Sequence, residues 1–161
     1  MKHVLSVLVE NKPGVLNRIS GLFARRGFNI DSLAVGETED PRLSRMTIAV
    51  DGQDQPLEQV TKQLHKLINV LKITDLEPAT SVERELVLIK IKADAQSRGE
   101  IIQIAEIFRA KIVDVSAQTI ILEATGGKDK LDGITALLRP FGIVELVRTG
   151  RVAMGRGKGK T

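Results

Sequence analysis

The segment at residues 10–16, with the sequence ENKPGVL, combines residue types that could bind a small zwitterion. Pro13 and Gly14 indicate the start of a helix, where free backbone N–H groups and a partial positive charge favour a carboxylate. Gly14 has no side chain to keep a ligand away from the backbone. Val15 and Leu16 could lie beside an apolar ligand side chain. An ordinary helix cap followed by core residues is the alternative, and spacing alone favours it.

Two asparagines could complete such a site. The amide of Asn11 can donate to a carboxylate and accept from an ammonium. Asn29 stands where a strand should begin, a position that usually favours β-branched residues, although a turn could also explain it. A helix of about 13 residues would separate the two asparagines by roughly 20 Å. A two-fold dimer could still bring them together, by placing Asn29 and Ile30 of one subunit against the helix start of the other.

Residues for catalysis or metal binding are scarce. Cysteine is absent, and neither His3 nor His65 has a second histidine or a carboxylate at metal-ligand spacing. No nucleophile elbow, complete phosphate loop or dinucleotide fingerprint occurs. Solvation explains the acids of one polar turn, which are Glu37, Glu39 and Asp40. The sequence therefore predicts no catalytic residue, no metal site and no cofactor on this chain.

The elements that must position these residues follow one pattern twice. In the first half, period-2 and helical spacing predict strands at 2–9, 28–37, 44–50 and 70–76, and helices at 13–27 and 57–67. In the second half, they predict strands at 85–93, 111–115, 119–124 and 143–147, and helices at 101–108 and 131–141. The order βαββαβ in each half predicts an α+β chain of two tandem ferredoxin-like domains, at 1–76 and 85–149, with a linker at 77–84.

Small domains of this kind leave one sheet face without helices. A unit of about 70 residues buries only about 60% of its unfolded surface, so we expect the domains to pair with each other or with a second chain. The last residues, 150–161, contain Arg151, Arg156, Lys158 and Lys160, no acid and several glycines. We expect this basic tail to be disordered and solvated.

The composition is that of a soluble globular protein. Of 161 residues, 42% are apolar and 27% charged, and the net charge is +4. No apolar run reaches the roughly 18 residues that span a bilayer. The first residues are too quickly polar for a signal peptide, so we expect a cytoplasmic protein.

A strand followed by ENKPGVL, a helix and then FNIDSL resembles the ACT domain, a small-molecule regulatory module. Longer segments, LSVLVENKPGVLNRISGLFARRGFNIDSL, DPRLSRMTI and LEQVTKQLHKLINVLKI, resemble the regulatory (small) subunits of acetolactate synthase, also called acetohydroxyacid synthase. The second half matches the same family through VERELVLIKI and FRAKIVDV. The resemblance covers essentially the whole chain except the basic tail.

This resemblance implies a role in the synthesis of the branched-chain amino acids valine and isoleucine, with no activity of the chain alone. A catalytic large subunit would carry thiamine diphosphate, magnesium and FAD, and the small subunit would activate it and confer allosteric feedback inhibition by valine. In the family valine lies between two ACT domains of a homodimer. The matching positions are Asn11, Gly14, Val15 and Leu16 of one chain and Asn29 and Ile30 of its partner.

The loop of the second half, at 95–99, lacks the asparagine and the Pro-Gly, so we expect that domain to serve assembly and not to bind the effector.

RNA-recognition domains share the βαββαβ order, but they stack bases on aromatic side chains of their strands, and SRMTIAV and TIILEA contain none. A stand-alone enzyme would need a titratable pair or a nucleophile that we do not find. We therefore expect neither nucleic acid nor a membrane as a partner.

Overall fold

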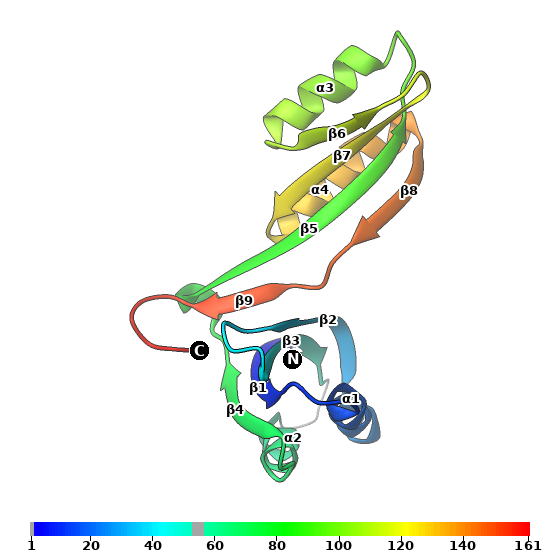
Figure 1. The fold of residues 1–161 in the computed structure, drawn as a ribbon. Coiled ribbons are helices and arrows are strands. Elements are labelled where there is room, and N and C mark those ends of the chain that lie inside the picture. The colour runs from blue at the N-terminus through cyan, green and yellow to red at the C-terminus, as the bar shows by residue number, and fades with distance from the viewer. Residues whose placement is uncertain (1, 53–56) are drawn as a thin grey trace. The chain divides into compact units, whose positions relative to one another are not determined.

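A computed structural model describes residues 2–52 and 57–161, and the chain divides into two compact units (Figure 1). Unit 1 comprises Met1–Glu83 together with Gly150–Thr161, and unit 2 comprises Arg84–Thr149. Each unit contains an antiparallel sheet and two α-helices, in the order that the sequence predicts.

Unit 1 has the βαββαβ order of a ferredoxin-like domain. Its elements are β1 (Lys2–Glu10), α1 (Val15–Arg25), β2 (Asn29–Glu37), β3 (Leu43–Asp51), α2 (Leu57–His65) and β4 (Val70–Asp75). The strands lie in the order β2-β3-β1-β4, so β2 and β4 form the two edges of this sheet.

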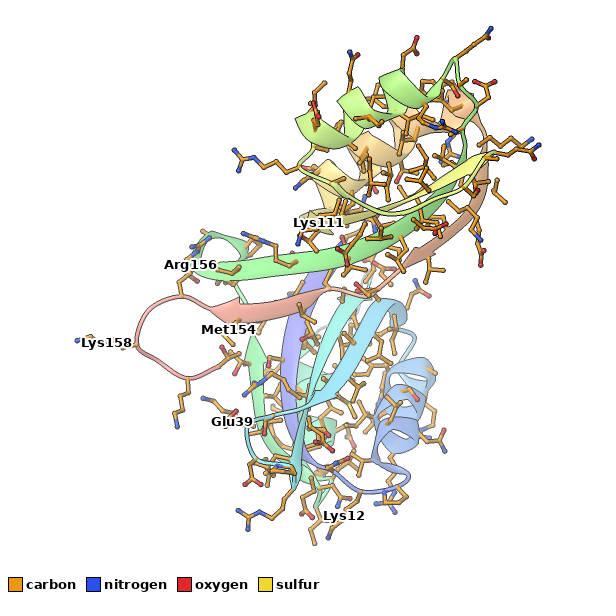
Figure 2. The ribbon with its side chains drawn as sticks, turned by 45° about the horizontal axis from the view of Figure 1, so that its top comes forward. Lys12, Glu39, Lys111, Met154, Arg156 and Lys158 are labelled. Carbon is orange, nitrogen blue, oxygen red and sulfur yellow. The ribbon has the colours of Figure 1, made fainter. Side chains whose placement is uncertain are left out.

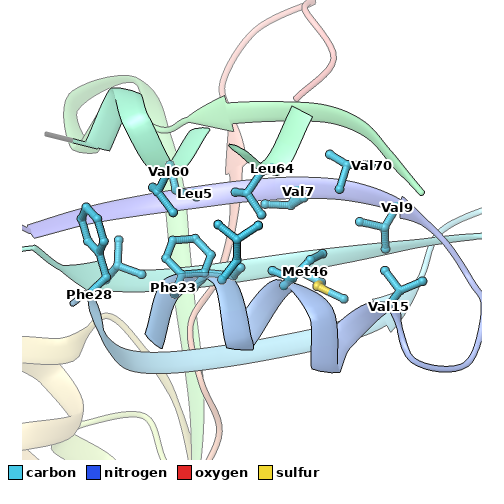
Figure 3. Packing of buried hydrophobic residues seen from close by; sticks show 14 residues of the cluster. Leu5, Val7, Val9, Val15, Phe23, Phe28, Met46, Val60, Leu64 and Val70 are labelled. Carbon is cyan, nitrogen blue, oxygen red and sulfur yellow. The ribbon is translucent and has the colours of Figure 1, made fainter. Parts of the chain in front are cut away.

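The core of unit 1 lies between this sheet and its two helices (Figure 3). Alternate residues of β1 point into it, which is why the strand reads as a period-2 pattern. Phe23 of α1 meets Phe28 edge-to-face, with ring centroids 6.1 Å apart. The fully buried members from strands and helices include Leu5, Val7, Met46, Ile48, Ile19, Val60 and Leu64.

Unit 2 repeats the same arrangement. Its elements are most of β5 (Ser81–Lys92), α3 (Arg98–Ile107), β6 (Lys111–Val115), β7 (Thr119–Gly126), α4 (Lys128–Leu138), the 3-10 turn η2 (Arg139–Phe141) and β8 (Ile143–Arg148). The strand order is β6-β7-β5-β8. A separate cluster forms its core, with Ile89, Ile101, Leu122 and Ile134 among the fully buried residues.

Two segments that we expected to be irregular are ordered. The expected linker at 77–84 contains the 3-10 turn η1 (Pro78–Thr80), and β5 already begins at Ser81. The expected disordered tail contains β9 (Val152–Gly155), which pairs with β5, so the expectation of disorder is wrong for these residues. A four-residue strand thus lies within a segment that is rich in glycine and basic residues.

The tail is ordered because it packs on the helix-free face of the first sheet. Ala153 of β9 is buried there against Val4, Ala49 and Leu76. Most of the other residues of the segment are exposed, and the side chain of Lys158 points away from the chain (Figure 2). Part of the face that we expected a partner to cover is thus covered by the chain itself.

No helix within the described residues has the length and apolar character needed to cross a membrane.

Candidate functional site

The strand register places the two asparagines of the predicted site at opposite ends of the first sheet. Lys2, the first residue of β1, and Asn29, the first residue of β2, both lie opposite Asp51 of β3. The loop with Asn11 follows the other end of β1. The 11 residues of α1 separate these ends by about 16 Å. One chain therefore does not bring Asn11 and Asn29 to one small ligand.

The start of α1 is a helix N-terminus without a side-chain cap. Gly14 occupies the N-cap position, no side chain bonds to the cap, and the first turn contains no acid. The first amide of the helix to reach a carbonyl four residues back is that of Arg18, which donates to Gly14 at 3.1 Å. The amides of Leu16 and Asn17 have no acceptor among the described residues. Such amides, together with the helix dipole, favour a carboxylate.

Gly14 gives this helix start both its shape and its open space. Its φ of 85° is left-handed, a conformation that L side chains rarely adopt. A Cβ built on Gly14 would meet no atom within 4 Å. Glycine is therefore required by backbone conformation and not by crowding, and the space beside the amides is free for a ligand.

Asn11 is held by the hairpin between β2 and β3. Its Nδ2 donates to the Glu37 carboxylate at 3.3 Å and to the Pro41 carbonyl at 3.1 Å. Its Oδ1 receives no hydrogen bond from any residue that the structure describes. Asn11 can therefore accept from a ligand ammonium, whereas donation to a carboxylate would require it to release a present partner.

The two apolar residues after Gly14 have different surroundings. Val15 is buried in the core of unit 1, so only its backbone faces the helix start. Leu16 is exposed over 41% of its surface and can contact a ligand side chain.

At the other end of the sheet, Asn29 and Ile30 open the edge strand β2. Asn29 is exposed, and its Nδ2 donates to the Asp31 carboxylate at 2.8 Å. Ile30 is half-buried and packs against the core. Both residues therefore lie beside the free edge of the sheet, where a second chain could pair.

In unit 2, the turn before the corresponding helix, α3, holds a carboxylate of the chain. Asp94 accepts from the amides of Gln96 and Ser97 at 2.9 and 2.8 Å, and its own amide donates to the Ser97 hydroxyl. The hydrogen bond from the Ser97 amide is the largest of the effects that lower the pKa of Asp94. A bound carboxylate would have to displace Asp94 from this position.

Glu37 is the residue of this region that sequence reasoning missed. We explained it by solvation, and the structure makes it a partner of Asn11 across 26 residues. The register of β2 against β3 could have indicated the contact, because Glu37 ends β2 beside the hairpin. Two basic side chains nearby have partners of their own. Nζ of Lys12 lies 2.8 Å from the Glu10 carboxylate, and the Arg18 guanidinium donates to Oδ1 of Asn69 at 3.0 Å.

Comparison with known proteins identifies the family of this chain. The model of an AHAS small subunit-like ACT domain matches residues 5–72, and that of the small subunit of acetolactate synthase matches residues 84–157. The acetolactate synthase small subunit of Mycolicibacterium smegmatis is 58% identical over 155 residues, covering 96% of this chain and 91% of the relative. The chain belongs to the small subunits of acetolactate synthase.

Two further relatives agree in length and in fold. A probable acetolactate synthase small subunit of Archaeoglobus fulgidus is 57% identical and covers 99% of this chain and 100% of its own. The crystal structure of the small subunit from Thermotoga maritima superposes with a TM-score of 0.91 at 47% identity, and covers 99% of both chains. The tandem ferredoxin-like fold is therefore confirmed, and the chain is a regulatory subunit whose catalytic partner is the large subunit. Among the described residues no group of three or more metal-ligating side chains occurs.

Proposed function

We propose that this chain activates the catalytic subunit of acetolactate synthase and confers feedback inhibition by valine. The valine would bind between the first units of two copies of the chain. The observation that carries this proposal is the uncapped start of α1, with its unpaired amides and the open space beside Gly14.

A two-fold pairing of β2 would assemble the site. β2 is an edge strand, and its outer edge can pair with a second copy of itself. In an antiparallel pair centred near the middle of β2, Asn29 of the partner subunit lies near Glu37, the last residue of the strand. Glu37 contacts Asn11, so this pairing brings the partner's Asn29 and the partner's Ile30 beside the helix start. The pair would also bridge the distance that separates the two residues in one chain.

Each group of valine then has a counterpart. The carboxylate would accept from the amides of Leu16 and Asn17, and the ammonium would donate to Oδ1 of Asn11. The isopropyl group would lie against Leu16 and the partner's Ile30. The partner's Asn29 would close the opposite wall.

Unit 2 would serve assembly and not effector binding. Asp94 lies in the turn before α3, and its negative charge would oppose a second ligand carboxylate there. Valine can change the activity of the complex only by its differential affinity for two states, typically 1–3 kcal/mol. In this proposal the less activating state is the one in which valine joins two first units.

The same proposal places thiamine diphosphate, magnesium and FAD on the catalytic subunit, and both subunits in the cytoplasm. The small subunit itself needs no cofactor, nucleic acid or membrane for the role described.

Co-expression with the catalytic subunit tests the function directly. Acetolactate formation is measured for the catalytic subunit alone, for the complex, and for the complex with valine, leucine or isoleucine. We expect activation by the small subunit and inhibition that is strongest with valine. A complex no more active than the catalytic subunit alone would contradict the first part, and a complex insensitive to all three amino acids would contradict the second.

A further inference from the structure

Residues 150–156 of the C-terminal segment are here called the strap. It lies directly on β2. A Cβ built on Gly150 would lie 2.6 Å from the carbonyl oxygen and 2.9 Å from the amide nitrogen of Leu33. These are backbone atoms and cannot rotate away, so only glycine allows this approach. The amide of Arg151 also donates to the hydroxyl of Ser32, at 3.4 Å.

The strap meets β2 next to its irregular point. The register of β2 against β3 shifts between Ile30 and Ser32, which marks a bulge at Asp31. Bulges re-aim neighbouring side chains and often occur next to functional sites. Here the bulge separates the two proposed valine-binding residues, Asn29 and Ile30, from the two that the strap contacts. A shift of the strand start on ligand binding would therefore reach the strap within three residues.

The other side of the strap reaches the chain connections between the units. β9 pairs with β5, and the amide of Arg156 donates to the carbonyl of Thr80 at 2.8 Å. The chain passes from unit 1 to unit 2 after Glu83 and returns before Gly150. The strap is continuous with one connection and paired with the strand that forms the other.

The end of the chain beyond the strap is fastened to the same sheet. Arg45 donates to the Ser6 hydroxyl at 2.7 Å and to the Thr161 carbonyl at 3.2 Å. Lys72 donates to the Lys160 carbonyl at 2.8 Å. Beside the strap a cavity of about 320 Å³, lined in part by Asp31 and Arg151, leaves room for movement. The segment is thus fixed at its far end, and the cavity lies where it meets the bulge.

We propose that the strap couples the proposed valine site to unit 2. Movement of the start of β2 shifts Gly150 and Arg151, and through them both connections of unit 2. This inference rests on the proposed function for the nature of the signal, whereas the contacts of the strap with β2 and β5 are independent of that function. Coupling requires such a contiguous element with two arrangements that both sites bias.

The coupling is tested without ligand by amide hydrogen exchange on the full chain. In Gly150→Ala, which forces the strap from Leu33, we expect the amides at 32–36 of β2 to exchange at least fivefold faster. Gly159→Ala is the matched control, because a Cβ there would meet no atom within 4 Å. If Gly150→Ala does not fold, Ser32→Ala takes its place. This variant removes only one weak hydrogen bond and should increase the exchange of the same amides by a smaller factor. Exchange of β2 that is equal in the folded variants and the control would overturn the proposal.

The signalling is tested with the catalytic subunit and valine. In wild type, we expect valine to change exchange of the amides at 80–83 and 152–155 at least twofold. In Gly150→Ala, valine should still bind within about threefold of its wild-type Kd, while the maximal inhibition falls at least twofold. Full inhibition of this variant would refute the coupling. If valine neither binds to nor inhibits the wild-type complex, the proposed function fails. The ligand-free exchange experiment still tests whether the strap is coupled to β2.

Discussion

Gly14 shows how one residue sets the character of the proposed site. Its left-handed φ turns the chain into α1 without any side chain at the cap, so the amides that follow are left for another acceptor. Asn11 complements them because its Nδ2 is occupied by the hairpin while its Oδ1 remains available. The chemistry of the site is therefore a set of backbone donors with one amide acceptor, which fits the two charged ends of an amino acid.

A negative charge at Gly14 should abolish this fit. In Gly14→Asp we expect the affinity for valine to fall at least tenfold, because the new carboxylate occupies the space of the ligand carboxylate. The left-handed conformation should cost about 1–2 kcal/mol of folding free energy, and activation of the catalytic subunit should persist. Calorimetry with valine and the acetolactate assay measure both effects.

Gly99→Asp is the matched control, because Gly99 lies in the first turn of α3 and has open space around it. Its valine affinity should equal that of wild type. Unchanged valine binding by Gly14→Asp would show that the pocket lies elsewhere.

At the scale of elements, the two units present the same helix start in two chemical states. Neither helix has a side-chain cap, but the turn before α3 holds the carboxylate of Asp94 on the amides of Gln96 and Ser97. The first turn of α1 holds no acid, whereas Asp94 precedes α3 and Glu100 lies in its first turn. Only unit 1 is therefore proposed to bind a carboxylate ligand such as valine.

Removal of the Asp94 carboxylate should affect stability and not regulation. In Asp94→Ala we expect the thermal midpoint to fall by a few degrees, because the amides of Gln96 and Ser97 lose their acceptor. Valine inhibition should be unchanged. Loss of valine inhibition in a folded Asp94→Ala protein would contradict the division of roles between the units.

The network on α4 and β8 predicts a pH dependence. Hydrogen bonds from Lys128 and from Arg148, each at 2.6 Å, lower the pKa of Asp132 from 3.8 to about 2. A carboxyl whose pKa is lower in the folded state stabilises the protein above the unfolded pKa, and this contribution disappears as the pH falls through the folded pKa. Asp132→Asn should therefore lower the urea midpoint at pH 7, and the difference from wild type should shrink as the pH falls from about 4 towards 2.

Glu106→Gln provides the control for this series, since Glu106 lies on α3 with no side-chain ion pair among the described residues. Its urea midpoint should follow that of wild type at each pH. A difference between Asp132→Asn and wild type that stays constant from pH 7 to pH 2 would contradict the low pKa of Asp132.

At the scale of the whole molecule, the proposed site exists only when two chains meet. The register of the first sheet separates Asn11 from Asn29, and β2 offers a free edge that a two-fold axis can pair. The other edge strand, β4, holds neither of these asparagines. Function should therefore depend on which edge is altered.

A charge on the β2 edge should separate the chains. Val35 is exposed over 46% of its surface. In the pairing that sets Asn29 against Glu37 it lies opposite the partner's Asp31, so Val35→Asp would place two like charges together. We expect the Kd of the dimer to rise at least tenfold and valine binding to be lost together with it. Sedimentation velocity and calorimetry measure the two quantities.

Leu71→Asp, at an exposed residue of β4, adds the same charge to the opposite edge and should change neither quantity. A Val35→Asp protein that stays dimeric and binds valine would exclude pairing through β2.

Much of this molecule could be predicted from its sequence, because local patterns carry the information. Alternating apolar residues such as Leu5, Val7 and Val9 fix a strand with one buried face. Helical spacing of Ile19, Leu22 and Phe23 fixes the buried stripe of α1. The doubled βαββαβ order then gave the fold, and the family resemblance gave the candidate residues.

Contacts between distant residues were decided only by the tertiary structure. The hold of Glu37 on Asn11, the burial of Ala153 on the first sheet and the closeness of Gly150 to Leu33 each join positions far apart in the chain. The tail was mistaken for disorder because glycines and basic residues make up most of it, whereas its order comes from the surface that it covers. Spacing along a chain reports which face of an element is apolar, but it does not report what that face will meet.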